Sequence, residues 1–273
     1  MTRNVQDIVK LALEEDVGSG DVSADLLREG NVEATITIRE SAVICGVEYV
    51  DEVFHQIDKS LAIKWHVMDG SYITINQEIC SINGPSASII SGERVALNFL
   101  QTLSSTATQT RAMVDKISHT KALLLDTRKT IPGLRLAQKY AVKCGGGVNH
   151  RMGLYDCVMI KENHILKLGS IKSAVEMAVE KHHELPLVLE VENLDQLNDA
   201  IKMNGIDRIL CDNFSKEMLL SAVDMAKNII PLEASGNIDE GNIVSIAETG
   251  VDYISIGSIT KNINAIDMSL RFS

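Results

Sequence analysis

The sequence predicts an α/β protein with a mixed N-terminal unit and a C-terminal parallel sheet that forms an incomplete barrel. Up to about residue 104, strand patterns alternate apolar with polar residues, which is typical of sheets that bury one face. Beyond that point, short and fully apolar runs recur with helical segments between them, which is typical of parallel strands buried on both faces. About 160 residues remain for this second unit, so it has room for fewer than eight strands.

The first unit begins with a helix, because apolar side chains recur at helical spacing over residues 4–15. A turn-rich loop follows in "EDVGSGDVS". The next elements are expected to be strands at 32–40, 61–67 and 77–84, a helix at 46–58, and a long helix from residue 86 towards 119.

The second unit contains apolar runs that almost all finish on polar or reactive residues. The runs are "ALLLDT", "CVMIK", "PLVLEVE", "RILCDN", "IIPLEASG" and "DYISIG". In a barrel all such strand ends ring one cavity, whereas a doubly wound sheet gathers its functional groups at one switch point. Polar groups at nearly every strand end therefore favour the barrel.

Composition points to a small-molecule partner. A net charge of -11 and a pI near 5.1 argue against nucleic acid or an acidic membrane as a partner. No apolar run approaches the roughly 20 residues of a membrane span, and the start of the chain lacks a signal-peptide pattern, so we expect a cytoplasmic protein. The five scattered cysteines include no C-x-x-C pair, which predicts buried, reduced thiols and indicates neither a disulfide framework nor a zinc site.

Positive charge gathers in residues 126–151, which hold six Lys or Arg and one His against a single carboxylate. Arg128, Lys129, Arg151 and Lys161 are expected at the mouth of the barrel, where guanidinium groups match carboxylates and phosphates. The cluster therefore predicts a small anionic ligand. A solvated helix face is the expectation for Arg135, Lys139 and Lys143.

Carboxylates lie on later strands, across the same predicted mouth. Two interpretations are open for Glu190, Glu192 and Asp212. They hold Mg²⁺, ribose hydroxyls or a developing oxocarbenium charge, or they form a salt-bridge network inside the barrel.

Glycine and serine follow the last two strands, at Ser235, Gly236 and Asn237 and again at Gly257 and Ser258. Backbone N–H groups at such helix starts bind phosphate in barrels, although ordinary strand-to-helix turns look the same. Two consecutive ends of this kind favour a phosphate site. The chain has no P-loop, G-x-S-x-G or G-x-G-x-x-G motif. Lys161 leaves another chemistry open, a Schiff base of the aldolase type.

Seven segments resemble one known family and occur in that family's order. They are "EDVGSGDVSADLL", "SGERVALNFLQTLSSTAT", "DTRKTIPGLRLAQKYAVKCGGGVNHRMGLYDCVMIKENH", "LEVEN", "CDNF", "EASGNI" and "ISIGS". On these residues the chain resembles the quinolinate phosphoribosyltransferases of NAD biosynthesis. The resemblance implies an N-terminal α/β sandwich domain at 1–104 and a C-terminal seven-stranded α/β barrel at 105–264, with a tail at 265–273 that packs back on the first domain. It also implies a homodimer or a larger assembly of dimers, up to a hexamer of dimers.

The resemblance further implies the reaction and its residues. Phosphoribosyl would pass from phosphoribosyl pyrophosphate to quinolinate, with decarboxylation, to give nicotinate mononucleotide, pyrophosphate and CO₂. The implied quinolinate site is Thr127, Arg128, His150, Arg151 and Lys161, with Arg94 supplied by the other subunit. The implied phosphoribosyl pyrophosphate site is Lys129, Glu190, Asp212, Ser235, Gly236, Asn237, Gly257 and Ser258. Mg²⁺ would be held by Glu190 and Asp212, directly or through water, and the implied catalytic residues are Lys129, Lys161, Glu190 and Asp212.

Three rival interpretations remain on the sequence alone. One is a phosphoribosyltransferase of the same fold with another acceptor, such as nicotinate or a base of molybdenum metabolism. The second is a lyase that forms a Schiff base at Lys161. The third is a catalytically silent protein that binds the same ligands.

Overall fold

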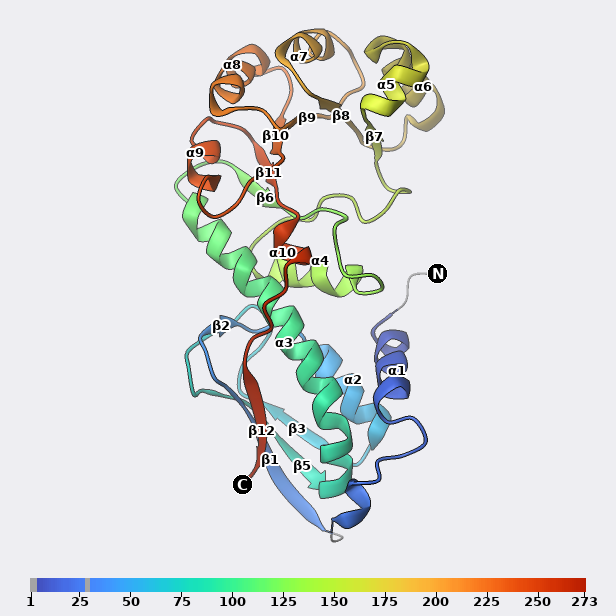
Figure 1. The fold of residues 1–273 in the computed structure, drawn as a ribbon, viewed down its shortest axis with the longest axis vertical. Helices are drawn as coiled ribbons and strands as arrows, with labels where there is room; N and C mark the ends of the chain where they lie inside the picture. Colours follow the sequence, from blue (N-terminus) through green and yellow to red (C-terminus); the bar gives the residue numbers. More distant parts are fainter. Residues whose placement is uncertain (1–3, 28–29) are drawn as a thin grey trace. The chain divides into compact units, whose positions relative to one another are not determined.

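The computed structural model describes residues 4–27 and 30–273, which fall into two compact units (Figure 1). The first unit runs up to Arg111 and adds two later segments, Ile131–Gly146 and Asn262–Ser273. The second unit comprises Ala112–Thr130 and Gly147–Lys261. The units therefore do not follow a single cut in the sequence.

The first unit holds one larger antiparallel sheet with its helices. Its elements are α1 (Val5–Asp16), the short 3-10 helix η1 (Ala24–Leu26), β1 (Asn31–Ile38), β2 (Ala42–Val43), α2 (Val47–Ile57), β3 (Ala62–Trp65), β4 (Tyr72–Ile73), β5 (Glu78–Pro85), most of α3 (Ser86–Ile117), α4 (Arg135–Cys144) and β12 (Met268–Phe272). The strand order of the larger sheet is β12-β1-β5-β3. The short strands β2 and β4 pair separately and were not expected from the sequence.

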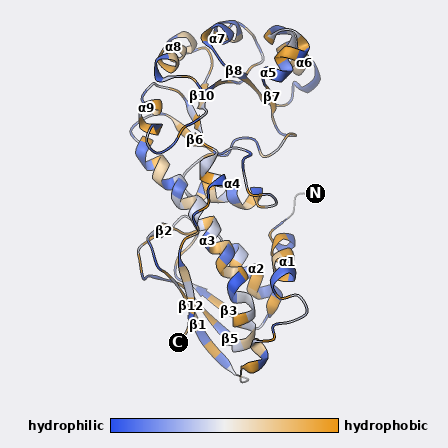
Figure 2. Cartoon of the chain, viewed as in Figure 1, coloured by the Kyte–Doolittle hydropathy of each residue, from blue (hydrophilic) through white to orange (hydrophobic). Residues whose placement is uncertain are grey.

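Strand β1 shows why this sheet forms. Its residues alternate between hydrophobic and hydrophilic (Figure 2), and the buried positions Ala34, Ile36 and Ile38 face the core. Ile36 pairs with Cys80 of β5 on one side and with Leu270 of β12 on the other. The last strand of the chain thus completes the sheet next to β1, and the core behind it is filled by side chains of α2 and α3.

Helix α4 corrects one expectation from the sequence. The prediction of a solvated face is wrong for Lys139, whose side chain is fully buried, although Lys143 is exposed. The helix is buried at Ala137, Ala141 and Val142 as well, so more than half of its circumference is covered. The long apolar stem of a lysine is compatible with such a position.

The second unit is built of parallel strands, each followed by helical structure. It contains the end of α3, then β6 (Leu123–Leu125), β7 (Val158–Ile160), α5 (Glu162–Leu168), α6 (Ile171–His182), β8 (Leu187–Val191), α7 (Leu194–Ala200), β9 (Arg208–Asp212), α8 (Lys216–Ala226), β10 (Leu232–Ser235), α9 (Ile243–Ala247), β11 (Tyr253–Ser255) and α10 (Ser258–Lys261).

The parallel sheet has the order β6-β11-β10-β9-β8-β7, with six strands among the residues that the structure describes. A single bridge between Leu125 and Val148 adds a seventh strand position beside β6. Helices α5 to α9 lie along the outer side of the curved sheet (Figure 1), as in a barrel, whereas a doubly wound sheet carries helices on both faces. The predicted α/β class, with an N-terminal antiparallel sheet and a C-terminal parallel unit, is confirmed.

Helix length and hydropathy together decide whether a helix can cross a bilayer. Within residues 4–27 and 30–273, no helix is both long enough and apolar enough to do so.

Candidate active site

The strand register brings polar side chains to one edge of the parallel sheet. Asp212 at the end of β9 is level with Ser235 at the end of β10, and Ser235 is level with Ser255 of β11. Ile160 is level with Leu189, so Lys161 and Glu190, one residue later on each strand, come next to each other. These are the carboxyl ends of the strands, where barrels place their functional groups.

Lys161 and Glu190 form an ion pair between Nζ and Oε2. The glutamate side chain is 15% exposed and the lysine side chain 43%, so the pair lies at the rim of the sheet interior. Lys161 is also the N-cap of α5, and its backbone N–H donates to Nδ1 of His164 at 3.0 Å. A Schiff-base lysine is usually desolvated in an apolar pocket, whereas Lys161 is partly exposed and ion-paired with a carboxylate. This environment suits anion binding better than Schiff-base formation.

The positive charge of Arg151 lies in an unfavourable environment, half-buried and close to a second guanidinium group. Burial lowers the pKa of Arg151, and the nearby charge of Arg128 lowers it further. Its guanidinium contacts the Cys157 carbonyl oxygen and the Met159 sulfur, both at 3.4 Å, and neither contact neutralises it. Two half-buried guanidinium groups that repel each other are stabilised when an anion binds between them. This geometry indicates a carboxylate or phosphate site.

Behind Arg151 lies a buried polar group that sequence reasoning missed. Glu233 on β10 is fully buried, and its Oε2 lies 3.0 Å from Nε of Arg208 and 3.4 Å from Nε2 of His150. The contact between Arg208 Nε and Glu233 Oε2 is an ion pair that does not have hydrogen-bond geometry. Arg208 also stacks on the ring of Tyr253, with 4.7 Å from Cζ to the ring centroid. The only sequence signal was a glutamate within the apolar run "IIPLEASG".

His150 connects this buried group to Arg151. Its Nδ1 accepts a hydrogen bond from the Arg151 backbone N–H at 2.7 Å, while its Nε2 faces Glu233. Nδ1 therefore acts as an acceptor, and a proton on Nε2 is directed at Glu233. Both ring nitrogens are engaged within the protein and the side chain is 5% exposed, so His150 is a buried neighbour of Arg151.

Asp126 fixes the segment that carries these residues. It follows β6 and is fully buried, and its two carboxylate oxygens accept hydrogen bonds from the His150 backbone N–H at 2.9 Å and from the Asn149 side chain at 2.6 Å. The segment after the triple glycine is thereby held against the end of β6. Thr127 contributes locally, because its hydroxyl accepts the Lys129 N–H at 3.0 Å.

The glycine-containing strand ends come close to the basic loop. A Cβ at Gly257 would lie 2.8 Å from Cδ of Lys129, and the Thr260 hydroxyl donates to the Lys129 carbonyl oxygen at 2.8 Å. Lys129 therefore lies against the start of α10, where Gly257 and Ser258 present backbone N–H groups. This places a cation beside a helix start, as expected for a phosphate site.

Gly236 has no room for a side chain. Its φ is +97°, and a Cβ there would lie 2.2 Å from the Asn213 side-chain oxygen. Asn237 donates to the same Asn213 oxygen at 3.1 Å, and the Asn213 amide donates to Asp212 at 2.9 Å. The loops after β9 and β10 are thus tied together around Asp212.

Arg94 is the one residue of the implied site that lies in the other unit. It is on α3 and its side chain is exposed. The remaining members of the implied site, from Thr127 to Ser258, all belong to the parallel-sheet unit.

The carboxylates at this edge are of the chemical type that binds magnesium ions. Mg²⁺ is usually bound by one or two carboxylates together with water and substrate phosphates, rather than by a protein cage. Glu190 and Asp212 are two such carboxylates on neighbouring strands, and Glu190 is also ion-paired with Lys161. Glu192, which the register places level with Asp212, is exposed, and its backbone N–H donates to Gln196 in α7.

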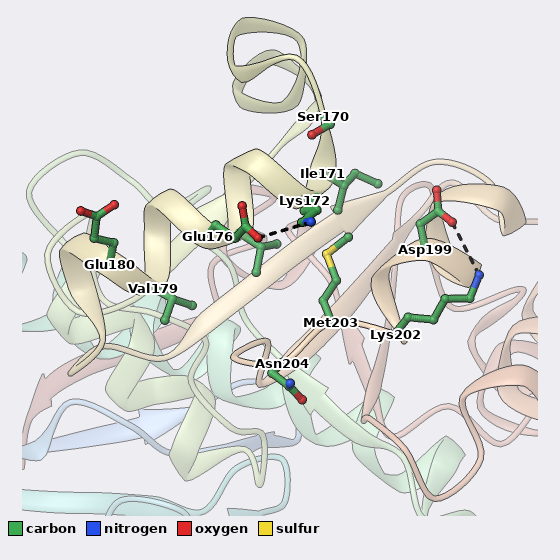
Figure 3. Close-up of a pocket in the computed structure, with 11 residues that line it drawn as sticks. Ser170, Ile171, Lys172, Glu176, Val179, Glu180, Asp199, Lys202, Met203 and Asn204 are labelled. Carbon is green, nitrogen blue, oxygen red and sulfur yellow. Dashed lines mark ion pairs between the residues drawn. The ribbon is translucent and has the colours of Figure 1, made fainter.

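A separate groove lies on the outer helices (Figure 3). It is lined by α6 residues such as Val175 and Val179 and by Met203, with ion pairs Lys172–Glu176 and Asp199–Lys202 beside it. None of the implied site residues lines it. It therefore has no part in the chemistry of the strand ends.

The fold and the family match together define the class of this protein as an α/β transferase. Residues 21–104 match the family model "Quinolinate phosphoribosyl transferase, N-terminal domain", and residues 106–271 match its C-terminal domain. The chain belongs to the quinolinate phosphoribosyltransferase family, and its activity class is that of a decarboxylating pentosyltransferase of NAD biosynthesis.

Individual relatives agree along nearly the whole chain. The "Nicotinate-nucleotide pyrophosphorylase [carboxylating], chloroplastic" of Oryza sativa subsp. japonica is 39% identical, with 99% of this chain and 78% of that protein covered. A probable nicotinate-nucleotide pyrophosphorylase of Bacillus subtilis is 38% identical, with 94% and 89% covered. The solved structure of the nicotinate-nucleotide pyrophosphorylase from Francisella tularensis has a TM-score of 0.96 at 47% identity and covers 98% of this chain and 96% of that one.

Proposed function

We propose that the carboxyl edge of the parallel sheet transfers phosphoribosyl from phosphoribosyl pyrophosphate to the ring nitrogen of quinolinate. The observation that carries the proposal is the pair of half-buried guanidinium groups, Arg128 and Arg151, in the same unit as the ion-paired Lys161. Family membership supports the same reaction.

The basic set matches a diacid. Quinolinate carries two adjacent carboxylates, and Arg128 and Arg151 offset the charge that they bring into the site. Lys161 adds a third cation at the rim. An acceptor with one carboxylate would offset less of the positive charge of this set, which is unfavourable in a partly buried site. Quinolinate is therefore a better match than nicotinate.

The second substrate, phosphoribosyl pyrophosphate, binds at the remaining strand ends of the parallel sheet. Ser235, Gly236 and Asn237 and the helix start at Gly257 and Ser258 bind its 5-phosphate, and Lys129 binds beside them. Glu190 and Asp212 would hold Mg²⁺, which when bound would supply positive charge to offset that of the pyrophosphate leaving group. Thr127 and His150 belong to the quinolinate site, and their hydrogen bonds also hold the basic loop and Arg151 in place.

In the transfer, the bond from C1 of the ribose to pyrophosphate breaks and a bond to the pyridine nitrogen forms. Positive charge develops at C1, and the carboxylates of Glu190 and Asp212 stabilise it electrostatically. The pyridinium nitrogen then stabilises the carbanion left at C2 when the 2-carboxylate leaves as CO₂. One proton must reach C2, and the two candidate donors are Lys161, at the rim of the site, and water.

A coupled assay tests the reaction. Purified protein with phosphoribosyl pyrophosphate and Mg²⁺ should release CO₂ in step with mononucleotide formation when quinolinate is the acceptor. Nicotinate should give neither product. Turnover of nicotinate, or of neither acceptor, would contradict the diacid assignment and leave the acceptor to be found by a substrate screen.

We further propose a homodimer in which Arg94 completes the partner's site, supported by the exposure of Arg94 on α3. Variants Arg94→Ala and Lys161→Ala should each be inactive. Heterodimers of the two should regain about half of the wild-type kcat, since one of two symmetry-related sites is then complete. Absence of activity in verified heterodimers would show that Arg94 acts in its own chain or not at all.

The domain limits and the compartment are proposals of the same kind. We propose a catalytic domain at 105–264, because every member of the implied site except Arg94 lies there. We propose a cytoplasmic enzyme, because all five cysteines are free thiols.

A further inference from the structure

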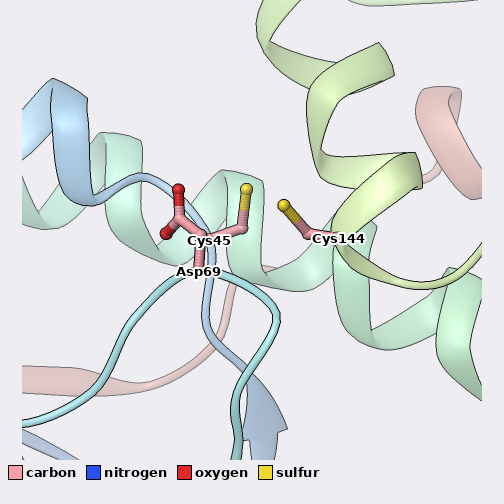
Figure 4. Close-up of side chains that lie close together, drawn as sticks. All are labelled: Cys45, Asp69 and Cys144. Atoms are coloured by element: carbon pink, nitrogen blue, oxygen red, sulfur yellow. The ribbon is translucent and has the colours of Figure 1, made fainter.

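Two thiols and a carboxylate converge in the first unit, apart from any residue of the proposed reaction. The sulfur atoms of Cys45 and Cys144 and a carboxylate oxygen of Asp69 all lie within 4.8 Å of one another (Figure 4). They come from separate segments. Cys45 precedes α2, Asp69 precedes β4, and Cys144 is the last residue of α4.

Each of these groups is held by its surroundings. The Cys45 backbone N–H donates to the Ser104 hydroxyl at 3.0 Å. One oxygen of Asp69 accepts the N–H groups of Gly46 and Val47 at 2.9 and 3.1 Å, and the other accepts the Tyr140 hydroxyl at 2.9 Å. Hydrogen bonds of this kind orient the ligands of metal sites. A carboxylate accepts about four hydrogen bonds, so a lone pair remains for a cation.

The position of Asp69 alone is explained by its capping of α2, and the position of a single buried thiol is explained by core packing. Neither explains why both thiols lie against the carboxylate. Among residues 4–27 and 30–273, no lysine or arginine forms an ion pair with Asp69. A divalent cation bound by the three groups would balance the charge of the carboxylate.

We propose that Cys45, Cys144 and Asp69 form a binding site for a thiophilic divalent cation of the Zn²⁺ class. Tetrahedral zinc, with Zn–S near 2.3 Å, keeps its ligand atoms up to about 3.8 Å apart, so the three groups need to approach by about 1 Å or less. Binding releases the two thiol protons to solvent. Cys144 and Asp69 are only half-buried, which leaves the fourth position to water. Mg²⁺ is not a competitor, because it prefers oxygen ligands.

The site was not visible in the sequence because its ligands lack the short spacing of zinc motifs. Gly145 helps to create it. A Cβ there would lie 2.4 Å from the Ala107 carbonyl oxygen, so only glycine lets the end of α4 approach α3 this closely. Cys144 is positioned by this contact.

The test measures metal binding in the reduced, full-length protein. Zn²⁺ is titrated in competition with a chromophoric chelator, and Cd²⁺ is titrated while the ultraviolet sulfur-to-cadmium charge-transfer band is recorded. Mg²⁺ is present in excess throughout, so that the carboxylates of the proposed active site are saturated. The main variant is Cys144→Ser, because this side chain is half-buried and its replacement should leave the fold intact. Cys80→Ala is the control, since Cys80 is buried in the same unit but outside the cluster.

We expect one Zn²⁺ per chain and a thiolate band with Cd²⁺ in the wild type and in Cys80→Ala. Cys144→Ser should lose the band and weaken Zn²⁺ binding by more than about 100-fold, because even partners of a metal ligand contribute 10- to 100-fold. Asp69→Asn should weaken binding and keep the band. Equal binding by Cys144→Ser and wild type would overturn the proposal, as would no binding by the wild type. Loss of two titratable thiols in air-exposed protein, together with no Zn²⁺ binding after reduction, would show a disulfide pair instead and would also overturn it.

Discussion

Replacing Arg151 with alanine should lower kcat/KM for quinolinate by about 30-fold to several thousand-fold. Truncating one member of a buried charge pair costs roughly 2–5 kcal/mol, and each 1.4 kcal/mol is about tenfold. The loss should appear mainly in KM for quinolinate, because the guanidinium binds the acceptor in both the ground state and the transition state. Measurement of kcat and KM for each substrate separately checks this.

The fold should be unaffected by this change. Burial and the charge of Arg128 already lower the pKa of Arg151, so the free protein loses little when the guanidinium is removed. Lys143→Ala is a matched control, because Lys143 belongs to the same basic segment but is exposed on α4. An unchanged KM for quinolinate in Arg151→Ala would remove this residue from the acceptor site.

The sequence alone predicted the elements that follow simple periodicities. The long helix expected from residue 86 towards 119 is α3, Ser86–Ile117, and the apolar runs of the second half are the parallel strands. These predictions succeed because the side-chain period reports which face is buried. The short strands β2 and β4 were missed, because two residues are too few to show a period.

Parts of the site were beyond this kind of reasoning. A glutamate or arginine in a strand does not reveal whether it points into the sheet interior, so Arg208 and Glu233 gave no clear signal. The burial of Lys139 was missed because helix spacing gives which residues share a face but not how wide the covered face is. Convergence of Cys45, Asp69 and Cys144 depends on tertiary structure, which no local spacing encodes.

Glu233→Gln should destabilise the protein more than other single carboxylate changes. Removing one partner of a buried ion pair costs roughly 3–5 kcal/mol, because the other charge is left without compensation. Here the uncompensated group is Arg208, whose side chain is 18% exposed. Denaturant unfolding of wild type and variant gives the difference, and Glu192→Gln serves as the control, since Glu192 is exposed.

Glu233→Gln should also change how the free energy of unfolding depends on pH in the acidic range. Burial alone would raise the pKa of Glu233, but contact with His150 and the charges of His150 and Arg208 lower it below the ordinary value of 4.5. A carboxylate with a lowered pKa contributes its full stabilisation above pH 4.5 and loses it as the pH falls through the lower value in the folded state. Glu233→Gln should therefore show a shallower loss of stability with acid than wild type. Parallel curves would mean that Glu233 is not ionised in the fold.

A double variant separates the effect on stability from the effect on the site. Glu233→Leu with Arg208→Met replaces the ion pair by apolar side chains, which in buried positions is often neutral or stabilising. His150 then loses the partner of its Nε2, and its hold on the Arg151 backbone through Nδ1 is weakened. We expect recovered unfolding free energy together with a raised KM for quinolinate. If the double variant regains stability and binds quinolinate as wild type does, Glu233 serves the fold alone and does not position Arg151.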